Sequence, residues 1–285
     1  MFERNHHNPF MFLYHIIILA LVQGVTEFLP ISSSGHLVLG HALMDGDFDS
    51  IRWHSADVVI DVAVHLGTLL SVLLYFRKDL LDMWNGTLSY ASERHKTQGG
   101  CLALYVVIAS IPVIIAGLCL HLLSPDWVRS IPVVAWATLI FGILLGVADK
   151  FGALDKKLEN MRISSALIIG LSQILALIPG TSRSGITMTA ARFCGFNRED
   201  SARFSLLLAI IAITGAGVIA MGDLIRTGDL ELGLNALFAV LTAFISGWVA
   251  ITLMMQWLRR ATFMPFVIYR VLLGGGLLVW LYWPS

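Results

Sequence analysis

The chain has 285 residues, of which 57% are hydrophobic and 13% are charged, and its formal net charge is zero. Long apolar stretches recur along it, and a stretch of about 18 or more such residues indicates a membrane-spanning helix rather than a soluble domain. The zero net charge argues against a nucleic-acid partner. We therefore predict an all-α polytopic membrane protein in contact with membrane lipids.

The first apolar segment, Phe12–Leu29, runs into a polar loop at Pro30–His36. Proline stops a helix because it lacks an amide hydrogen. The apolar segment that follows, Leu37–Met44, is too short to cross a bilayer, which takes about 20 residues. We predict a helical hairpin that dips into the membrane and returns on the same side; the alternative is that Phe12–Leu29 crosses fully. No small-residue cleavage site follows, so we do not expect a removed signal peptide.

Six later segments are long and apolar enough to cross the membrane, and they fall into two groups of three. Between the groups lies a second dipping hairpin, Ser165–Pro179 followed by Ile186–Phe196. The predicted spans are Ala56–Phe76, Ala103–Leu123, Ile131–Asp149, Phe204–Gly222, Asn235–Trp257 and Pro265–Trp283.

The polar positions of the first hairpin recur in the second, which indicates an internal repeat. Spaced 150 residues apart, the matching pairs are Gln23 and Gln173, Ser32 and Ser182, Ser34 and Ser184, and Gly35 and Gly185. Each half is a re-entrant helix hairpin plus three transmembrane helices. Because three is odd, the second half enters from the opposite face, which makes the repeat inverted. We predict one membrane domain over residues 1–285, with a first repeat at 10–150 (loop near 30–36) and a second at 160–285 (loop near 179–187).

Most lysines and arginines fall on one side of this topology, in the segments 77–102, 150–164, 192–203 and 258–260. By the positive-inside rule this side is cytoplasmic, so both termini face out. The spans were chosen by length and hydropathy, which makes the charge distribution an independent check on the topology.

Both loops carry residues suited to anions. The serines that follow Pro30 and Pro179 are good helix N-caps, and a helix start offers free N–H groups and the positive end of the helix dipole. The glycines at 35 and 185 let the backbone approach a ligand closely. In an inverted repeat the two helix starts meet from opposite faces. Together with Arg183, whose planar fork suits phosphate, they favour a diphosphate ligand.

The first loop adds acid–base groups. Gln23 and Glu27 are four residues apart and share a helical face, and His36 lies a short loop away. Glu27 can act as a base or hold a divalent cation, and His36 can transfer protons or attack phosphorus. The second half has Leu177 and Ile186 at the corresponding positions. This division of labour favours an enzyme.

Two other functions are compatible with the same pattern. A transporter or flippase would also use inverted repeats with broken helices, and the family resemblance given below would make its cargo polyprenyl phosphate. In a structural scaffold, Glu27 and Arg183 would pair without taking part in chemistry. Release of phosphate by the purified protein separates the enzyme from both.

Two further groups of polar residues lie within predicted spans. Asp57, Asp61 and His65 are spaced four apart on one helical face, where they line the mouth of the site or help Glu27 to hold a metal. Arg270, inside the last span, either pairs with a carboxylate or extends to the interface.

In its polar motifs the chain resembles the undecaprenyl-diphosphate phosphatase family, the integral membrane enzymes linked to bacitracin resistance. The first family motif appears as QGVTEFLPISSSGH at Gln23–His36 and the second as PGTSRSGIT at Pro179–Thr187. The segments Asp61–Thr68 and Pro265–Arg270 also fit. Gln23 stands where some members have glutamate, which leaves one carboxylate in the first motif. The resemblance covers essentially the whole chain.

The resemblance implies hydrolysis of undecaprenyl diphosphate to the monophosphate and inorganic phosphate, which recycles the lipid carrier for cell-wall synthesis. It places the protein in the bacterial inner membrane with its site open to the outer side. It also implies a divalent cation, Mg²⁺ or Ca²⁺, with Glu27 as the first candidate ligand and Asp61 as a weaker one. A monomer and a homodimer both remain open.

We assign roles on this basis as a hypothesis. Arg183 and Glu27 are catalytic, and the nucleophile is Ser33, His36 or water. The remaining polar residues of the two motifs bind the substrate: Gln23, Ser32, Ser34, Gly35, Ser182, Ser184, Gly185 and Thr187.

Overall fold

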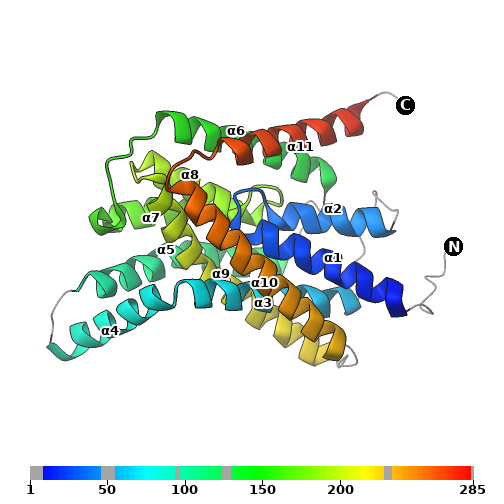
Figure 1. Cartoon of the computed structure of the whole chain (residues 1–285), viewed down its shortest axis with the longest axis horizontal. Coiled ribbons are helices and arrows are strands. Elements are labelled where there is room, and N and C mark those ends of the chain that lie inside the picture. Colours follow the sequence, from blue (N-terminus) through cyan, green and yellow to red (C-terminus); the bar gives the residue numbers. More distant parts are fainter. Residues whose placement is uncertain (1–8, 46–54, 94–96, 124–129, 228–232, 284–285) are drawn as a thin grey trace.

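The computed structural model describes residues 9–45, 55–93, 97–123, 130–227 and 233–283, and these residues form a bundle of helices (Figure 1). The α-helices are α1 (Pro9–Phe28), α2 (Ser33–Asp45), α3 (Ser55–Tyr75), α4 (Arg77–Glu93), α5 (Gln98–Leu123), α6 (Ile131–Phe151), α7 (Ile163–Gln173), α8 (Arg183–Phe193), α9 (Arg198–Thr227), α10 (Gly233–Leu258) and α11 (Met264–Tyr282). Two short 3₁₀ helices, η2 (Leu158–Asn160) and η3 (Ile174–Leu177), flank α7.

Five helical segments are individually long and apolar enough to span a membrane: α5, α6, α11, Arg198–Val218 of α9 and Ala236–Leu258 of α10. They coincide with five of the six predicted spans, which confirms those predictions by length and composition. The described part of the chain is therefore a multi-pass helical membrane protein.

The sixth predicted span, Ala56–Phe76, coincides with α3, which runs from Ser55 to Tyr75. Counted from Ile60, where its described side chains begin, α3 is long and apolar enough for one span together with α4, and the two helices meet at a bend of 73°. Residues 77–102, which the predicted topology places between two spans on the cytoplasmic side, include the helix α4, and α4 packs along α5. Close approach explains the packing, because a Cβ added to Gly86 would lie 2.3 Å from the backbone nitrogen of Gly100.

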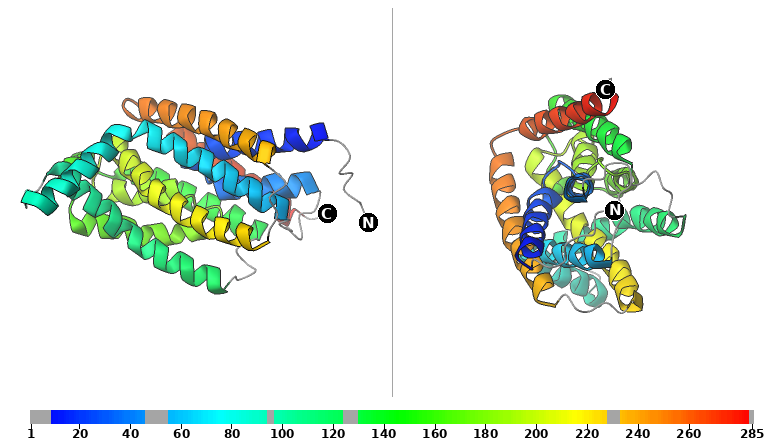
Figure 2. Two further views of the ribbon diagram at one scale, coloured as in Figure 1. Left: turned by 90° about the horizontal axis from the view of Figure 1, so that it is seen from below. Right: turned by 90° about the vertical axis from the view of Figure 1, so that its right-hand side faces the viewer.

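The two serine loops lie between paired helices, as predicted. α1 packs against α2, and α7 with η3 packs against α8. In Figure 1 the α1–α2 pair extends toward the end of the molecule where α11 finishes, and the α7–α8 pair extends toward the opposite end. Figure 2 shows from below that most helices of the bundle run roughly along its long axis. The pairs thus approach each other from opposite ends.

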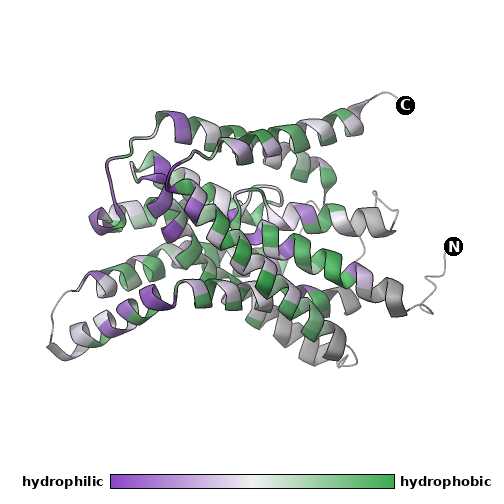
Figure 3. Ribbon diagram, viewed as in Figure 1, coloured by the Kyte–Doolittle hydropathy of each residue, from purple (hydrophilic) through white to green (hydrophobic). Residues whose placement is uncertain are grey.

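Apolar and polar residues separate along the bundle. Figure 3 shows green, hydrophobic helices over most of the length and purple, hydrophilic residues concentrated at the end where α7 begins. Ion pairs gather at that end, including Arg198–Asp149 at 2.6 Å and Arg259–Glu199 at 2.9 Å. This distribution matches the side that the sequence analysis assigned to the lysines and arginines.

Helix α10 covers both α1 and α3 at close range, and small residues make this possible. A Cβ added to Gly67 of α3 would lie 2.3 Å from the carbonyl oxygen of Val240.

We expect Gly67→Ala to lower the free energy of unfolding by about 1–3 kcal/mol, since an overpacked contact forces the backbones of α3 and α10 apart. Gly275→Ala on α11, where an added Cβ would meet no atom within 4 Å, is the matched control. Equal melting temperatures for the two variants would contradict this packing.

Candidate active site

The two loops have the same local structure, and the sequence explains it. Pro30 and Pro179 precede turns, after which α2 begins at Ser33 and α8 begins at Arg183. The Ser182 hydroxyl accepts the backbone N–H of Gly185 at 3.0 Å, and the Ser32 hydroxyl accepts that of Gly35 at 3.3 Å. Each serine is therefore the N-cap of the helix that follows it.

Both capping serines adopt a backbone conformation that L-residues seldom take. The φ angle is 76° at Ser32 and 70° at Ser182, and these two are the only positive φ values among the described non-glycine residues. Such positions cost on the order of 1–3 kcal/mol each and persist where the surrounding structure enforces them, commonly at functional sites. The strain falls on equivalent residues of the two loops, which the residue pattern alone did not reveal.

The loops touch each other. The Ser184 hydroxyl of the second loop donates to the carbonyl oxygen of Leu29 in the first at 2.8 Å. A Cβ added to Gly35 would lie 3.6 Å from the Cα of Gly180. These glycines let the two backbones meet, as the prediction of one shared site requires.

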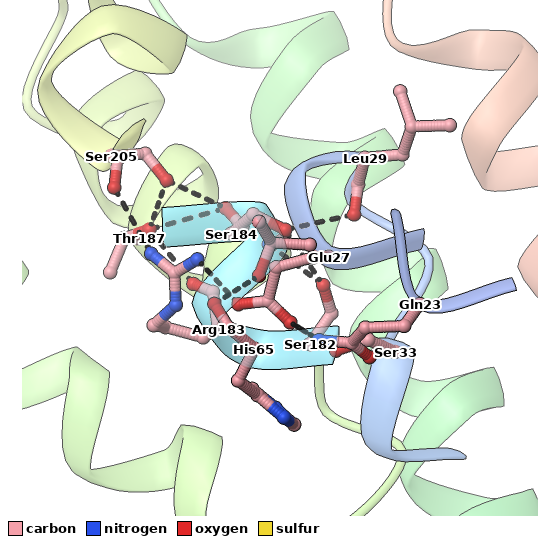
Figure 4. A network of polar contacts seen from close by, with 12 residues as sticks. Gln23, Glu27, Leu29, Ser33, His65, Ser182, Arg183, Ser184, Thr187 and Ser205 are labelled. Atoms are coloured by element: carbon pink, nitrogen blue, oxygen red, sulfur yellow. Dashed lines mark hydrogen bonds and ion pairs between the residues drawn. The ribbon is translucent and has the colours of Figure 1, made fainter. Parts of the chain in front are cut away.

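Glu27 is the centre of the polar contacts (Figure 4). One carboxylate oxygen accepts from the Ser33 hydroxyl at 2.7 Å and from the Gln23 side-chain amide at 2.9 Å. The other oxygen accepts from Arg183 of the second loop at 3.1 Å. Glu27 is 8% exposed, so this ion pair lies inside the protein. The structure thus brings together Glu27, Ser33 and Arg183, all predicted as catalytic.

Behind Arg183 lies a layer of residues from α8 and α9. Arg183 also donates to the carbonyl oxygen of Ser205 at 3.2 Å, and the Ser205 and Thr187 hydroxyls are 2.7 Å apart. Thr187 further donates to the Arg183 carbonyl at 2.8 Å. The structure therefore places Thr187 as a support for Arg183. Sequence analysis missed Ser205, whose signal is a buried serine in an otherwise apolar span.

The hydrogen-bond partners of the His36 ring are Ser32 and Tyr269. Its Nδ1 lies 2.6 Å from the Ser32 carbonyl oxygen and its Nε2 lies 2.5 Å from the Tyr269 hydroxyl. The His36 and Tyr269 rings stack with centroids 5.7 Å apart. Both ring nitrogens are thus engaged. Tyr269 lies in a segment that carried the family resemblance, but it received no predicted role.

Of the predicted stripe on α3, the side chains that the structure describes are those of Asp61 and His65. His65 Nδ1 lies 2.6 Å from the backbone carbonyl of Asp61, and Figure 4 shows the His65 ring extending away from the Glu27–Arg183 pair. The side chain of Asp57 lies outside the described residues. Within the described ranges, no three His, Cys, Asp or Glu side chains are grouped so that they could hold a metal ion.

Arg270 takes neither of the roles that the sequence suggested. It is fully buried, so it does not extend to the interface, and it forms no ion pair with a carboxylate of the described residues. Its guanidinium instead donates to backbone carbonyls, two of them at Gly180 and Thr181. Arg270 takes this role because it is buried among the backbones of α6 and the two loops, whose carbonyl oxygens accept its hydrogen bonds in place of a carboxylate.

The fold and the site define a polytopic helical membrane protein in which a serine hydroxyl, a buried carboxylate and a partly buried arginine are joined by direct contacts. Residues 16–276 match the family model described as "Bacitracin resistance protein BacA", and the chain belongs to this family.

Curated relatives match over nearly their full lengths. The chain is 45% identical to the "Undecaprenyl-diphosphatase" of Roseobacter denitrificans, over 95% of this chain and 100% of the relative. It is 46% identical to the "Undecaprenyl-diphosphatase" of Hahella chejuensis, over 94% of this chain and 97% of the relative. This similarity confirms the family that the motifs indicated.

The strained serine caps can be tested by substitution. Glycine adopts a positive φ without strain, and replacing a serine N-cap by glycine costs only a few tenths of a kcal/mol. We expect Ser182→Gly to keep the melting temperature within about 3 °C, whereas Ser182→Val lowers it by about 5 °C or more, because a β-branched residue resists φ of 70°. If Ser182→Val were as stable as Ser182→Gly, the left-handed backbone at this loop would be wrong.

Proposed function

We propose that this chain hydrolyses undecaprenyl diphosphate to undecaprenyl phosphate and inorganic phosphate. One observation carries the proposal: the Ser33 hydroxyl donates to Glu27 at 2.7 Å, and Glu27 binds Arg183 at 3.1 Å. A nucleophile, its base and a phosphate-binding cation are thereby linked in one buried chain of contacts. The names of the relatives, "Undecaprenyl-diphosphatase", support the identity of the substrate.

In the proposed reaction the Ser33 oxygen attacks the terminal phosphorus of the diphosphate. The serine proton passes to Glu27, and the bond between the terminal phosphorus and the bridging oxygen breaks. Undecaprenyl phosphate leaves and takes the proton from Glu27, and a phosphoserine remains. Water then attacks this phosphoserine as the ionised Glu27 accepts its proton. Glu27 passes this proton to the Ser33 oxygen as the bond from that oxygen to phosphorus breaks, which releases inorganic phosphate and restores the serine hydroxyl.

Charge stabilisation comes from the second loop. Phosphoryl transfer depends chiefly on positioning and on neutralising the oxygens of the transferred group. Arg183 supplies a cation, and the starts of α2 and α8 supply N–H groups that have no partner within their own helices. In this proposal the substrate phosphate competes with Glu27 for Arg183, so that the carboxylate, which already accepts the Ser33 hydroxyl, is released from the arginine and can take the serine proton.

Four other predicted residues take three roles in this proposal. Gln23 orients Glu27 through its amide, and Ser34 and Ser184 lie at the two helix starts, where phosphate oxygens would bind. His36 is proposed to position the loop rather than to attack phosphorus, because its ring is held by the Ser32 carbonyl and Tyr269.

An apolar groove supports a lipid substrate. It has a volume of about 640 Å³ and lies between α1, α10 and α11. Leu29 connects the groove to the polar site, since this residue lines the groove and its carbonyl oxygen accepts the Ser184 hydroxyl. The groove offers a hydrocarbon tail a surface next to the head-group site.

A divalent cation fits this site only as a companion of the substrate. Glu27 is the one carboxylate of the described residues in the contact cluster, and both its oxygens already accept hydrogen bonds. Mg²⁺ is often bound by one or two carboxylates together with substrate phosphates. Glu27 would be its protein ligand, and the ion would neutralise phosphate charge. The steps above are assigned to protein residues alone.

We further propose that the two halves are inverted repeats with re-entrant hairpins. The equivalent strained serines support this, as does the packing of α1 on α10 and of α7 on α5, which relates corresponding helices of the two halves. With the lysine- and arginine-rich end in the cytoplasm, both termini lie outside and the α1–α2 hairpin enters from the outer side. The enzyme would then recycle the lipid carrier at the outer face of the inner membrane and so confer bacitracin resistance.

The role of the central ion pair is tested by phosphate release from lipid diphosphate in detergent. We expect Glu27→Gln and Arg183→Ala each to lower kcat by about 10²-fold or more, because they remove the base and the stabilising cation. Ser92→Ala on α4, whose exposed hydroxyl contacts only its own helix, is the control and should be unaffected. Near-normal rates in either site variant would remove that residue from the mechanism.

The covalent step is tested by rapid acid quench with substrate labelled on the terminal phosphate. We expect the label on Ser33 during turnover and its complete loss in Ser33→Ala. Turnover without any labelled protein would instead favour direct attack by water.

A further inference from the structure

Arg270 is a buried cation that the proposed mechanism does not use. Its exposed fraction is 0%, and the hydrogen bonds of its guanidinium all run to backbone carbonyls. Burying a charge is costly unless its hydrogen-bonding capacity is filled. The identity of the acceptors therefore shows what this arginine holds in place.

The acceptors come from both serine loops. Arg270 donates to the carbonyl of Pro30 in the first loop at 3.3 Å. It donates to the carbonyls of Gly180 and Thr181 in the second loop at 2.9 Å and 2.8 Å. Two further acceptors, Ala137 and Thr138, lie on α6 at 3.4 Å and 3.2 Å. One side chain from α11 thus binds both loops to the same helix.

These carbonyls belong to peptide groups just ahead of the strained serines. Thr181 immediately precedes Ser182, and Pro30 lies two residues before Ser32. A peptide group is planar, so fixing its carbonyl also fixes the direction of its N–H group. Left-handed residues persist only where their surroundings enforce the conformation. Arg270 supplies that enforcement at both loops.

We propose that Arg270 is a positioning residue that clasps the two loops together and so sets the separation and orientation of the two helix starts that bind the diphosphate. The inference rests on the proposed function for its choice of ligand. Arg270 acts through Ser32, Ser182 and their neighbours. Arginine suits this task because five donors in a rigid fork reach several carbonyls at once, which lysine cannot do.

The first test compares two buried arginines. Arg192 is also 0% exposed, but it lies in the last turn of α8, at the opposite end of that helix from the second loop. It donates to the carbonyls of Gly152 and Ala153 and pairs with Asp149. Both Arg270→Lys and Arg192→Lys should lower the melting temperature. Only Arg270→Lys should lower kcat, by about 10²-fold, the effect expected of a misplacement near 1 Å.

A binding measurement separates this inference from the proposed hydrolysis. Millimolar methylenediphosphonate, a diphosphate that is not hydrolysed, should raise the melting temperature of the unchanged protein, since a ligand of the folded state stabilises it. Arg270→Lys should lose more than half of this rise, and Arg192→Lys should keep it. If methylenediphosphonate stabilises the unchanged protein but that protein releases no phosphate from lipid diphosphate, the proposed hydrolysis is wrong while the positioning role of Arg270 still holds.

A second pair of variants applies if Arg270→Lys does not fold. A Cβ added to Gly142 on α6 would lie 2.7 Å from the Arg270 Cβ and 3.3 Å from its Nε, so Gly142→Ala displaces the arginine without altering either loop. One turn along, a Cβ added to Gly146 meets Val267 at 3.0 Å instead. Gly142→Ala should lower kcat by about 10-fold or more, and Gly146→Ala should leave kcat within about twofold.

Any of three results would contradict the positioning role of Arg270. The first is that Arg270→Lys folds and keeps a normal kcat and a normal rise in melting temperature with methylenediphosphonate. The second is that Gly142→Ala and Gly146→Ala lose kcat equally. The third is that methylenediphosphonate does not raise the melting temperature of the unchanged protein.

Discussion

The structure depends on an ion pair between two loops that are far apart in sequence. Glu27 and Arg183 meet at 3.1 Å with side chains that are 7% and 14% exposed. Inside a membrane protein either charge alone would be costly, whereas the pair is satisfied by its own contact and by Ser33, Gln23 and the Ser205 carbonyl. The pairing therefore requires both loops to be in place at once, and the surrounding helices are arranged to meet that requirement.

The same contacts explain why the loops can serve chemistry. A serine hydroxyl that attacks phosphorus needs a nearby acceptor for its proton, such as a carboxylate. The negative charge that develops on the phosphate oxygens needs hydrogen-bond donors in fixed positions. The first loop contributes Ser33 and Glu27, and the second contributes Arg183. Because the proposed mechanism divides its catalytic groups between the two halves, it depends on their relative position as much as on their identity. This is why a buried arginine that touches both loops, Arg270, becomes relevant to the reaction.

Much of this arrangement could be predicted from the sequence. The spans follow from hydropathy, and the matching positions Gln23 and Gln173, Ser32 and Ser182 indicated that the loops correspond. The proximity of Glu27 to Arg183 followed from placing those loops at one site. In contrast, the 73° bend between α3 and α4 depends on packing against α5, which residue patterns do not encode.

Tertiary contacts also explain the residues that sequence analysis missed or misjudged. Arg270 binds carbonyls, whose positions are unknown until the backbone is folded. Tyr269 contacts His36 from another helix, and Ser205 on α9 contacts Thr187 and Arg183 on α8. The positive φ angles of Ser32 and Ser182 arise from the turn geometry that the surrounding helices enforce, because serine itself has no preference for them.

The most direct test of the central claim is an experimental structure of the protein with methylenediphosphonate bound. The account predicts one diphosphonate between the loops, within hydrogen-bonding distance of both Ser33 and Arg183, with Glu27 still on the serine hydroxyl. A diphosphonate that contacts only one loop, or that lies away from the Glu27–Arg183 pair, would contradict it.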